Sequence, residues 1–293
     1  MLSAAVVASV FKPSDLSNLV AWYDALDSST ITSDSDGVSA WNDKSGNNYH
    51  GTQSTDAKKP TLGTSADNGL VAINFADPLN TTSGDSLLTS NPIWSYDERT
   101  TFVVCTKIAN STRTAPYLHN YFRLKSTESC AAGILFAGDG SDTNFGDHTD
   151  EVYGAMGLIS GNPSNTAQLS DTADGVDVLV RQSYKLTASG VSGDFMTAQK
   201  NAEAEVSFPQ SVTNLSTQTD AADGQSKTTF STIGLTAVIG GYVTSFTNSS
   251  TQSLTPVALW SGSIQEICDY NRALSDAEMN QVMGYLLGKW RVT

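Results

Sequence analysis

One short loop, residues 43–51, begins two residues after a tryptophan and contains carboxylate and amide side chains. Asp43 opens the loop, and Asn47 follows a glycine. A carboxylate beside a Gly-Asn turn can present side-chain and backbone oxygens together, and such oxygens are the ligands that Ca²⁺ requires. The same two residues can instead stabilise the turn by hydrogen bonding to nearby backbone amides. Both interpretations of Asp43 and Asn47, a calcium site and a capped turn, stay open at this point.

Acid–base catalysis has one candidate, Glu266, in the strand-like segment 264–269. Glycosidases that retain or invert stereochemistry use a pair of carboxylates. Side chains alternate along a strand, so Asp269 is expected to face away from Glu266 and to leave it with Ile264 and Cys268 as neighbours. The three histidines lack the spacing of a zinc site. We therefore predict no catalytic residues and interpret the protein as non-enzymatic.

Aromatic side chains in loop-like or strand-end segments are candidates for carbohydrate binding. Sugar rings pack on aromatic faces while neighbouring polar groups hydrogen bond to the hydroxyls. The residues that fit this description best are Trp94, Tyr96, Tyr117 and Phe145. We predict that these residues form a carbohydrate-binding surface.

An apolar segment, residues 2–10, precedes the first predicted strand. No basic residue stands before it, and it is too short to cross a bilayer. An ordered apolar end of a chain needs a surface to lie on, which is either its own domain or a neighbouring subunit. We predict that residues 1–15 are an N-terminal arm that docks on a partner protein through Leu2, Val6, Val7, Val10 and Phe11.

The chain is strongly acidic. Its 293 residues include 16 Lys and Arg against 30 Asp and Glu, which gives a net charge of −14. Such a charge repels the phosphates of nucleic acids and anionic membranes, so neither is expected as a partner, and no transmembrane segment is predicted. The three cysteines are an odd number in a long chain, so no disulfide framework is implied.

Many short apolar segments alternate with turns rich in Ser, Thr, Asn, Asp and Gly. Residues 19–24 and 100–108 are predicted strands, and 33–37 is a turn inside a predicted hairpin over 31–41. Residues 211–231 are rich in Ser and Thr and are expected to form a surface loop. This succession indicates a β-sandwich more than an alternating βαβ architecture.

The last part of the chain predicts one amphipathic helix. Ser275 is an N-cap residue, and Glu278 three residues later completes a capping box. Apolar residues then recur at helical spacing and should form the buried face; they are Met279, Val282, Met283, Leu286 and Leu287. Gly288 is expected to end the helix.

Three segments together resemble the laminin-G-like, concanavalin A-type jelly rolls of many bacterial and phage proteins. They are residues 19–27, the loop 41–51 with Asn48 where glycine is usual, and residues 262–278. The resemblance implies an all-β concanavalin A-like jelly-roll sandwich over residues 16–293, with one short C-terminal helix and polar insertions between 109 and 232. It also implies a calcium-ligand role for Asp43. The tryptophans within these segments or near them, Trp22, Trp41, Trp260 and Trp290, are expected in the core.

Three hypotheses about function remain, because this fold hosts lectins, enzymes and structural modules. We prefer a non-enzymatic virion structural, decoration or adhesion protein that is docked by its arm. Its partners would be other virion proteins, its own copies in a homo-oligomer and cell-surface glycans. The alternative is a secreted, calcium-dependent carbohydrate-binding lectin or adhesin. The third hypothesis is a glycoside hydrolase.

Overall fold

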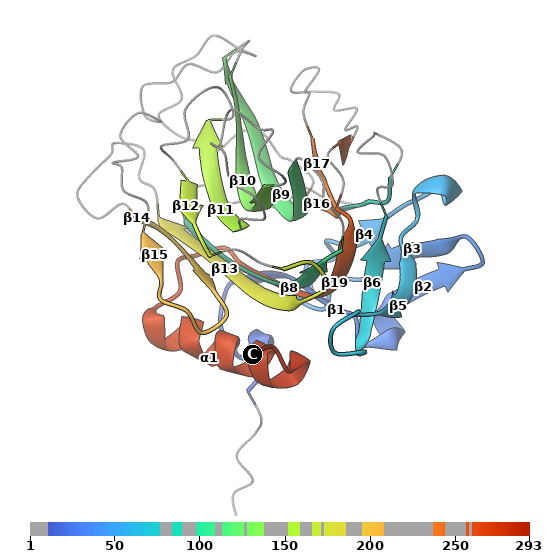
Figure 1. Ribbon diagram of the computed structural model, residues 1–293, viewed down its shortest axis with the longest axis horizontal. Helices are drawn as coiled ribbons and strands as arrows, with labels where there is room; N and C mark the ends of the chain where they lie inside the picture. Colours follow the sequence, from blue (N-terminus) through green and yellow to red (C-terminus); the bar gives the residue numbers. More distant parts are fainter. Residues whose placement is uncertain are drawn as a thin grey trace, which may run out of the picture.

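The computed structural model describes residues 11–76, 84–89, 98–108, 113–125, 128–137, 152–158, 166–170, 173–185, 195–207, 237–243, 256–257 and 260–293. In these residues two antiparallel sheets lie against each other, and one helix covers the outer face of one sheet (Figure 1). The predicted all-β jelly-roll sandwich with one short C-terminal helix is confirmed. No helix in the described part of the chain is long and apolar enough to cross a membrane.

The sheet that carries the helix, here the helix-covered sheet, follows the order β15-β14-β13-β8-β19-β6-β5, with β1 also pairing with β19. Its strands are β1 (Leu19–Asp24), β5 (Thr61–Thr64), β6 (Val71–Phe75), β8 (Glu98–Lys107), β13 (Asp177–Lys185), β14 (Phe195–Lys200), β15 (Val206–Ser207) and β19 (Gly262–Tyr270). The first and last parts of the chain therefore meet in one sheet.

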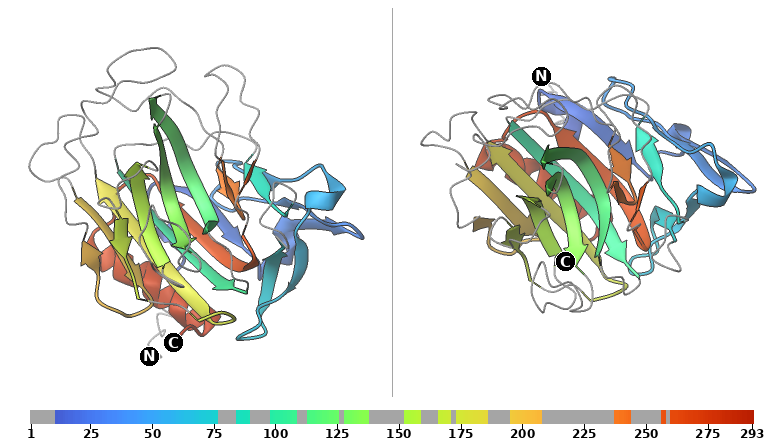
Figure 2. Two further views of the ribbon diagram at one scale, coloured as in Figure 1. Left: turned by 45° about the horizontal axis from the view of Figure 1, so that its top comes forward. Right: turned by 90° about the horizontal axis from the view of Figure 1, so that it is seen from above.

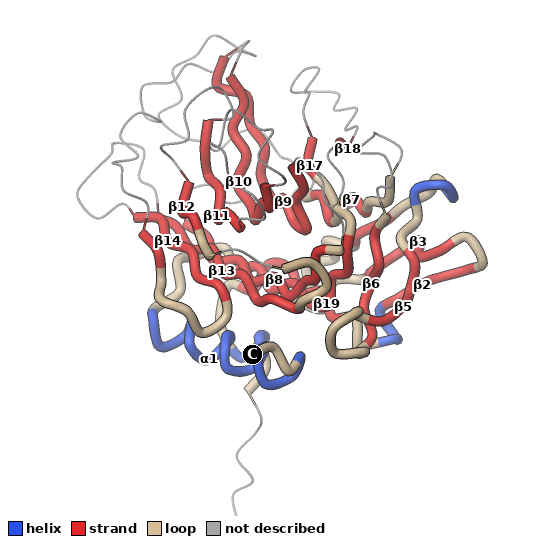
Figure 3. Tube along the Cα trace, in the orientation of Figure 1, coloured by secondary structure: helices blue, strands red, loops and turns tan. Residues whose placement is uncertain are grey.

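The second sheet follows the order β12-β11-β10-β9-β16-β7-β4-β3-β2. Its strands β9 to β12 lie on the opposite side of the helix-covered sheet from α1 (Figure 3), and Figure 2 shows the same arrangement from two further directions. Its strands are β2 (Ile31–Asp34), β3 (Gly37–Trp41), β4 (Gly51–Thr52), β7 (Leu87–Thr89), β9 (Arg113–Lys125), β10 (Glu128–Ala137), β11 (Val152–Leu158), β12 (Thr166–Gln168) and β16 (Val238–Ile239). A small pair, β17 (Tyr242–Val243) and β18 (Pro256–Val257), and the 3₁₀ turns η1 (Pro13–Asp15), η2 (Ser28–Thr30) and η3 (Asp56–Lys58) complete the described elements.

The predicted strand over 100–108 and the predicted hairpin over 31–41 are both present. Strand β8 lies between β13 and β19 in the middle of the helix-covered sheet, and its residues after Glu98 are all buried. Such burial on both faces explains why this segment is a nearly continuous apolar and β-branched run. Strands β2 and β3 pair antiparallel as the hairpin, with Asp34 opposite Gly37.

A β-bulge at Gln265 interrupts the pairing of β19 with β8. Ile264 lies opposite Cys105 and Glu266 opposite Val104, so one residue of β19 is extra. Partners across a ladder share a face, and consecutive residues on β8 face opposite sides. The expectation that Ile264 and Glu266 share a face is therefore wrong.

Helix α1 (Asp276–Trp290) begins as the sequence predicts. The Ser275 side chain accepts a hydrogen bond from the Glu278 backbone, and the Glu278 carboxylate accepts one from the Ser275 backbone at 2.9 Å. The predicted stop at Gly288 is wrong, because the helix continues to Trp290 and ends where Arg291 adopts a φ of 55°. The two extra residues bring the Trp290 side chain into the core, where it is fully buried.

Aromatic and sulfur-containing side chains fill the interior as expected. The four tryptophans assigned to the core, Trp22, Trp41, Trp260 and Trp290, are all buried. Cys105 and Cys268 are buried free thiols, and burial raises the pKa of each well above its usual value. These cysteines act as small packing groups in the core.

Candidate functional site

The Asp43 carboxylate binds the backbone of its own loop and of β1. Its Oδ1 accepts hydrogen bonds from the backbone amides of Trp22 and Ser45, each at 2.8 Å. Its Oδ2 accepts one from the Ser45 hydroxyl at 2.7 Å and one from the Tyr49 amide at 3.2 Å. The side chain is buried. These four hydrogen bonds are the contacts that the capped-turn interpretation predicts. A cation at Asp43 would compete with the same four hydrogen-bond donors.

Asn47 joins the same loop to the first strand. Its amide nitrogen donates to the backbone oxygens of Leu19 and Val20, each at 3.1 Å. The next residue, Asn48, has a φ of 61°, a conformation that Asn adopts more readily than other non-glycine residues. Among the described residues, no group of three or more His, Cys, Asp or Glu is arranged to hold a metal ion. Calcium binding at Asp43 and Asn47 stays a prediction.

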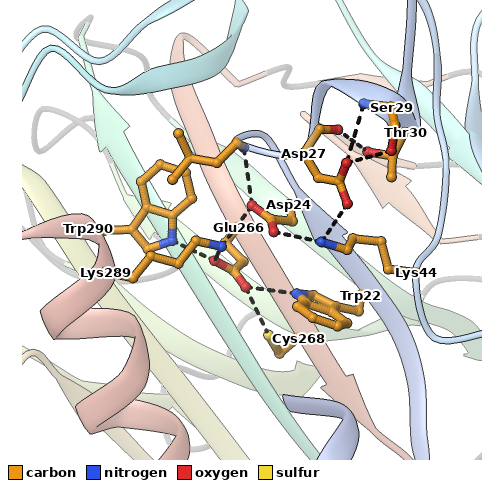
Figure 4. Close-up of polar contacts among 11 residues, drawn as sticks. Trp22, Asp24, Asp27, Ser29, Thr30, Lys44, Glu266, Cys268, Lys289 and Trp290 are labelled. Carbon is orange, nitrogen blue, oxygen red and sulfur yellow. Dashed lines mark hydrogen bonds and ion pairs between the residues drawn. The ribbon is translucent and has the colours of Figure 1, made fainter. Parts of the chain in front are cut away.

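A second polar centre lies beneath α1, around Glu266 (Figure 4). Its Oε1 accepts a hydrogen bond from the Trp22 indole at 2.7 Å. Its Oε2 accepts hydrogen bonds from the Trp290 indole at 2.6 Å and from the Lys289 ammonium at 2.5 Å. The Glu266 side chain has no exposed surface. Strand β1 and the last turn of α1 thus supply these three donors, and the Cys268 thiol of β19 adds a long contact to Oε1 at 3.9 Å.

Asp24 lies directly opposite Glu266 across β1 and β19. Its Oδ1 is 2.7 Å from the Lys289 ammonium, and its Oδ2 is 2.8 Å from the Lys44 ammonium. Lys44 continues to Asp27, also at 2.8 Å. The structure therefore contains an alternating row of negative and positive groups that runs from the buried Glu266 outward. The expectation that no second carboxylate accompanies Glu266 is wrong.

Burial is the main influence on the pKa of Glu266. Removal from water raises the pKa of the Glu266 carboxyl, while the Lys289 charge acts in the opposite direction and the Asp24 charge adds to the increase. The indole of Trp22 also lowers it by hydrogen bonding to the charged form. A carboxyl with a raised pKa can take up and release a proton closer to neutral pH than an exposed one.

Glu266 is not presented to a substrate from outside. Both of its oxygens are used by groups of the protein, and the indoles of Trp22 and Trp290 lie against it. A glycosidase instead needs its two carboxyl groups on either side of an accessible glycosidic bond. The Glu266 and Asp24 carboxylates instead bind neighbouring side chains of the protein.

The remaining predicted site residues are mostly outside the described part of the chain. Those outside it are Leu2, Val6, Val7, Val10, Trp94, Tyr96 and Phe145. Tyr117 lies in β9 opposite Ile134, and its side chain is not among those described. Phe11 packs edge-on against Tyr285 of α1, with ring centroids 6.1 Å apart. Phe11, the last of the predicted docking residues, thus contacts its own domain, and the docking and carbohydrate surfaces stay predictions.

Sequence reasoning missed Asp24, Lys44 and Lys289. Asp24 is part of the opening strand, but nothing in the sequence shows that its partner is near the other end of the chain. Lys289 lies in the last turn of a helix, where a lysine interacts favourably with the helix dipole. That common role gives no sign that Lys289 also binds buried carboxylates. The pairing of β1 with β19 and the packing of α1 and the 43–51 loop against these strands bring the three residues together.

Comparisons with known proteins give a fold and no family. No protein-family model and no curated protein matches this sequence. The chain is similar to the solved structure of Trypanosoma rangeli sialidase, with a TM-score of 0.51 and 10% identity over 98% of this chain and 35% of that one. A mutant of that sialidase displaying trans-sialidase activity has a TM-score of 0.50 and 11% identity, over 94% and 34% of the two chains.

Domain 4 of AbnA, a GH43 extracellular arabinanase from Geobacillus stearothermophilus, has a TM-score of 0.43 and 13% identity, over 91% of this chain and 98% of that one. The chain spans about a third of the length of the sialidases that it matches. At these identities the sialidase similarity supports the all-β fold alone.

Proposed function

We propose that this protein is a non-enzymatic carbohydrate-binding β-sandwich module that serves in adhesion or in decoration of a large assembly such as a virion. One observation carries the non-enzymatic part: Lys289 binds both Glu266 and Asp24, and two indoles hydrogen bond to the buried Glu266. The carbohydrate part is supported by the fold, since one sialidase structure of similar fold holds a difluoro nononic acid, a sugar acid.

The proposed assembly follows from the laminin-G-like resemblance and the apolar arm. In this proposal the arm docks on other virion proteins or on a second copy of the chain, and the sandwich contacts cell-surface glycans. Secretion as a calcium-dependent lectin is the alternative. The net charge of −14 is compatible with either setting and repels nucleic acid.

A glycan array tests the carbohydrate part directly. The full chain is applied with Ca²⁺ and with a chelator, on an array that includes sialylated glycans and arabinan fragments. We expect binding that is lost in W94A, Y96A, Y117A or F145A and kept in the matched aromatic control Y285A. An array without binding in both conditions overturns the carbohydrate part.

The effect of Ca²⁺ on glycan binding distinguishes the proposed assembly module from the secreted lectin. Binding that survives the chelator supports the calcium-independent module. Binding that disappears with the chelator and in D43N supports the lectin alternative, with Asp43 as a ligand. Turnover of a sialoside or an arabinan that falls in E266Q would instead establish a glycoside hydrolase.

A further inference from the structure

Asp24 and Lys289 meet in a closed environment although they come from the first strand and the last helical turn. The Lys289 nitrogen is 2.7 Å from Asp24 Oδ1, and the two side chains are 17% and 7% exposed. The same nitrogen is 2.5 Å from Glu266 Oε2. Lys289 therefore contacts both a carboxyl group that its amine can attack and a second carboxyl group able to move protons (Figure 4).

We propose that Lys289 and Asp24 form an intramolecular amide bond, with Glu266 as the group that transfers the proton. The Lys289 nitrogen attacks the carboxyl carbon of Asp24, a C–N bond forms, and the bond to Oδ1 breaks. Glu266 first accepts a proton from the Lys289 ammonium, which frees the amine to attack, and then passes that proton to Oδ1. The nitrogen releases a second proton to Oδ1 after it has added to the carbon, and Oδ1 leaves as water. An ammonium and a carboxylate contain the atoms of one amide and one water, so no oxidant, nucleotide or other reactant is needed.

The surroundings of Asp24 favour this step. The Lys44 ammonium lies 2.8 Å from Oδ2, where negative charge builds up when the nitrogen adds to the carbon, and such a fixed charge stabilises the intermediate. The reacting groups are held together by the strand and the helix, which replaces a bimolecular encounter with a local one. The buried Glu266, whose pKa is raised, suits proton transfer between nitrogen and oxygen.

Other ion pairs in the described residues lack one part of this arrangement. The Lys59–Asp34 pair is 2.9 Å apart, but the Asp34 side chain is 51% exposed. The Arg99–Asp269 pair is fully buried at 2.7 Å, but a guanidinium stays protonated and is a poor nucleophile. Lys289 combines an amine, a largely buried carboxyl partner and an adjoining buried carboxyl group.

Intact-mass spectrometry of the full chain, unfolded after purification, tests the proposal. We expect a mass lower than that of the sequence by one water, and a proteolytic fragment in which the Asp24 peptide is joined to the Lys289 peptide. K289R retains the positive charge and the ion pairs but cannot form the amide, so it should show the full mass. E266Q should form the bond at least tenfold more slowly than the wild type.

The matched control is K59R, an identical change at an ordinary ion pair, which should keep the loss of one water. The proposal is overturned if the folded wild type, checked by circular dichroism, has the full sequence mass after prolonged incubation. It is also overturned if K289R still loses water, or if the fragment joins Lys289 to Glu266. The mass of the wild-type chain tests the amide bond even if E266Q does not fold. None of these outcomes depends on carbohydrate binding.

Discussion

Asp24 and Glu266 are direct cross-strand partners, and one lysine, Lys289, binds both carboxylates. Like charges opposite each other in a sheet destabilise it unless a cation lies between them. The helix supplies that cation from its last turn, so the two ends of the domain depend on each other. Because α1 continues past Gly288, Lys289 lies in its last turn and contacts both carboxylates.

The first prediction concerns the indole donor of Trp290. Replacing Trp290 by Phe keeps an aromatic ring in the core and removes the hydrogen bond to the buried Glu266. We expect a loss of about 1–3 kcal/mol in the free energy of unfolding, because a buried acceptor loses a partner. Urea denaturation measures it, and Trp41→Phe is the control, because the buried indole nitrogen of Trp41 has no hydrogen-bond partner among the described residues. A Trp290→Phe variant as stable as the wild type would show that the indole contact contributes packing alone.

The second prediction separates a turn from a metal site at Asp43. Asp43→Ala leaves the amides of Trp22, Ser45 and Tyr49 without their acceptor. We expect destabilisation of about 2–4 kcal/mol, since several donors lose a charged partner at once. In the capped-turn interpretation the loss is equal with and without Ca²⁺ in thermal unfolding. A wild-type melting temperature that rises with Ca²⁺ while that of Asp43→Ala does not would establish the calcium site.

Patterns of neighbouring residues predicted local structure, but they could not predict how distant segments pair. Ser275 and Glu278 are three residues apart, so a capping box could be inferred from sequence, and the structure shows it. The bulge at Gln265 depends on how β19 meets β8, and a regular alternation gave the wrong face for Ile264. The carboxylate pair depends on β1 lying beside β19, which no short-range pattern contains.

The third prediction is a pH dependence at the start of α1. Arg272 binds the Glu278 carboxylate and, with the Ser275 backbone, lowers the pKa of Glu278 to about 2. Because the pKa is lower in the folded state, the stabilisation is complete above the usual carboxyl pKa and is lost as the pH falls toward about 2.

Glu278→Gln removes this titration while it keeps an oxygen that can accept the Ser275 hydrogen bond. We expect the variant to be about 1 kcal/mol less stable than the wild type at neutral pH, the typical scale of a cap, and to converge with it at acid pH. Denaturation at a series of pH values checks this, with Asp276→Asn as the control. A difference between Glu278→Gln and wild type that is constant with pH would contradict the assignment.

The last prediction compares two glycines that share a backbone conformation. Gly240 and Gly175 have φ values of 81° and 79°, so alanine strains the backbone at either position. A Cβ at Gly240 would lie 2.2 Å from Phe75 Cδ1, whereas a Cβ at Gly175 would meet nothing within 4 Å. Gly240→Ala should therefore cost about 1–3 kcal/mol more than Gly175→Ala, because only the first forces a core ring to move. Urea denaturation of both variants measures the difference. Equal losses would mean that the turn after β16 accommodates the methyl group and that backbone strain accounts for both effects.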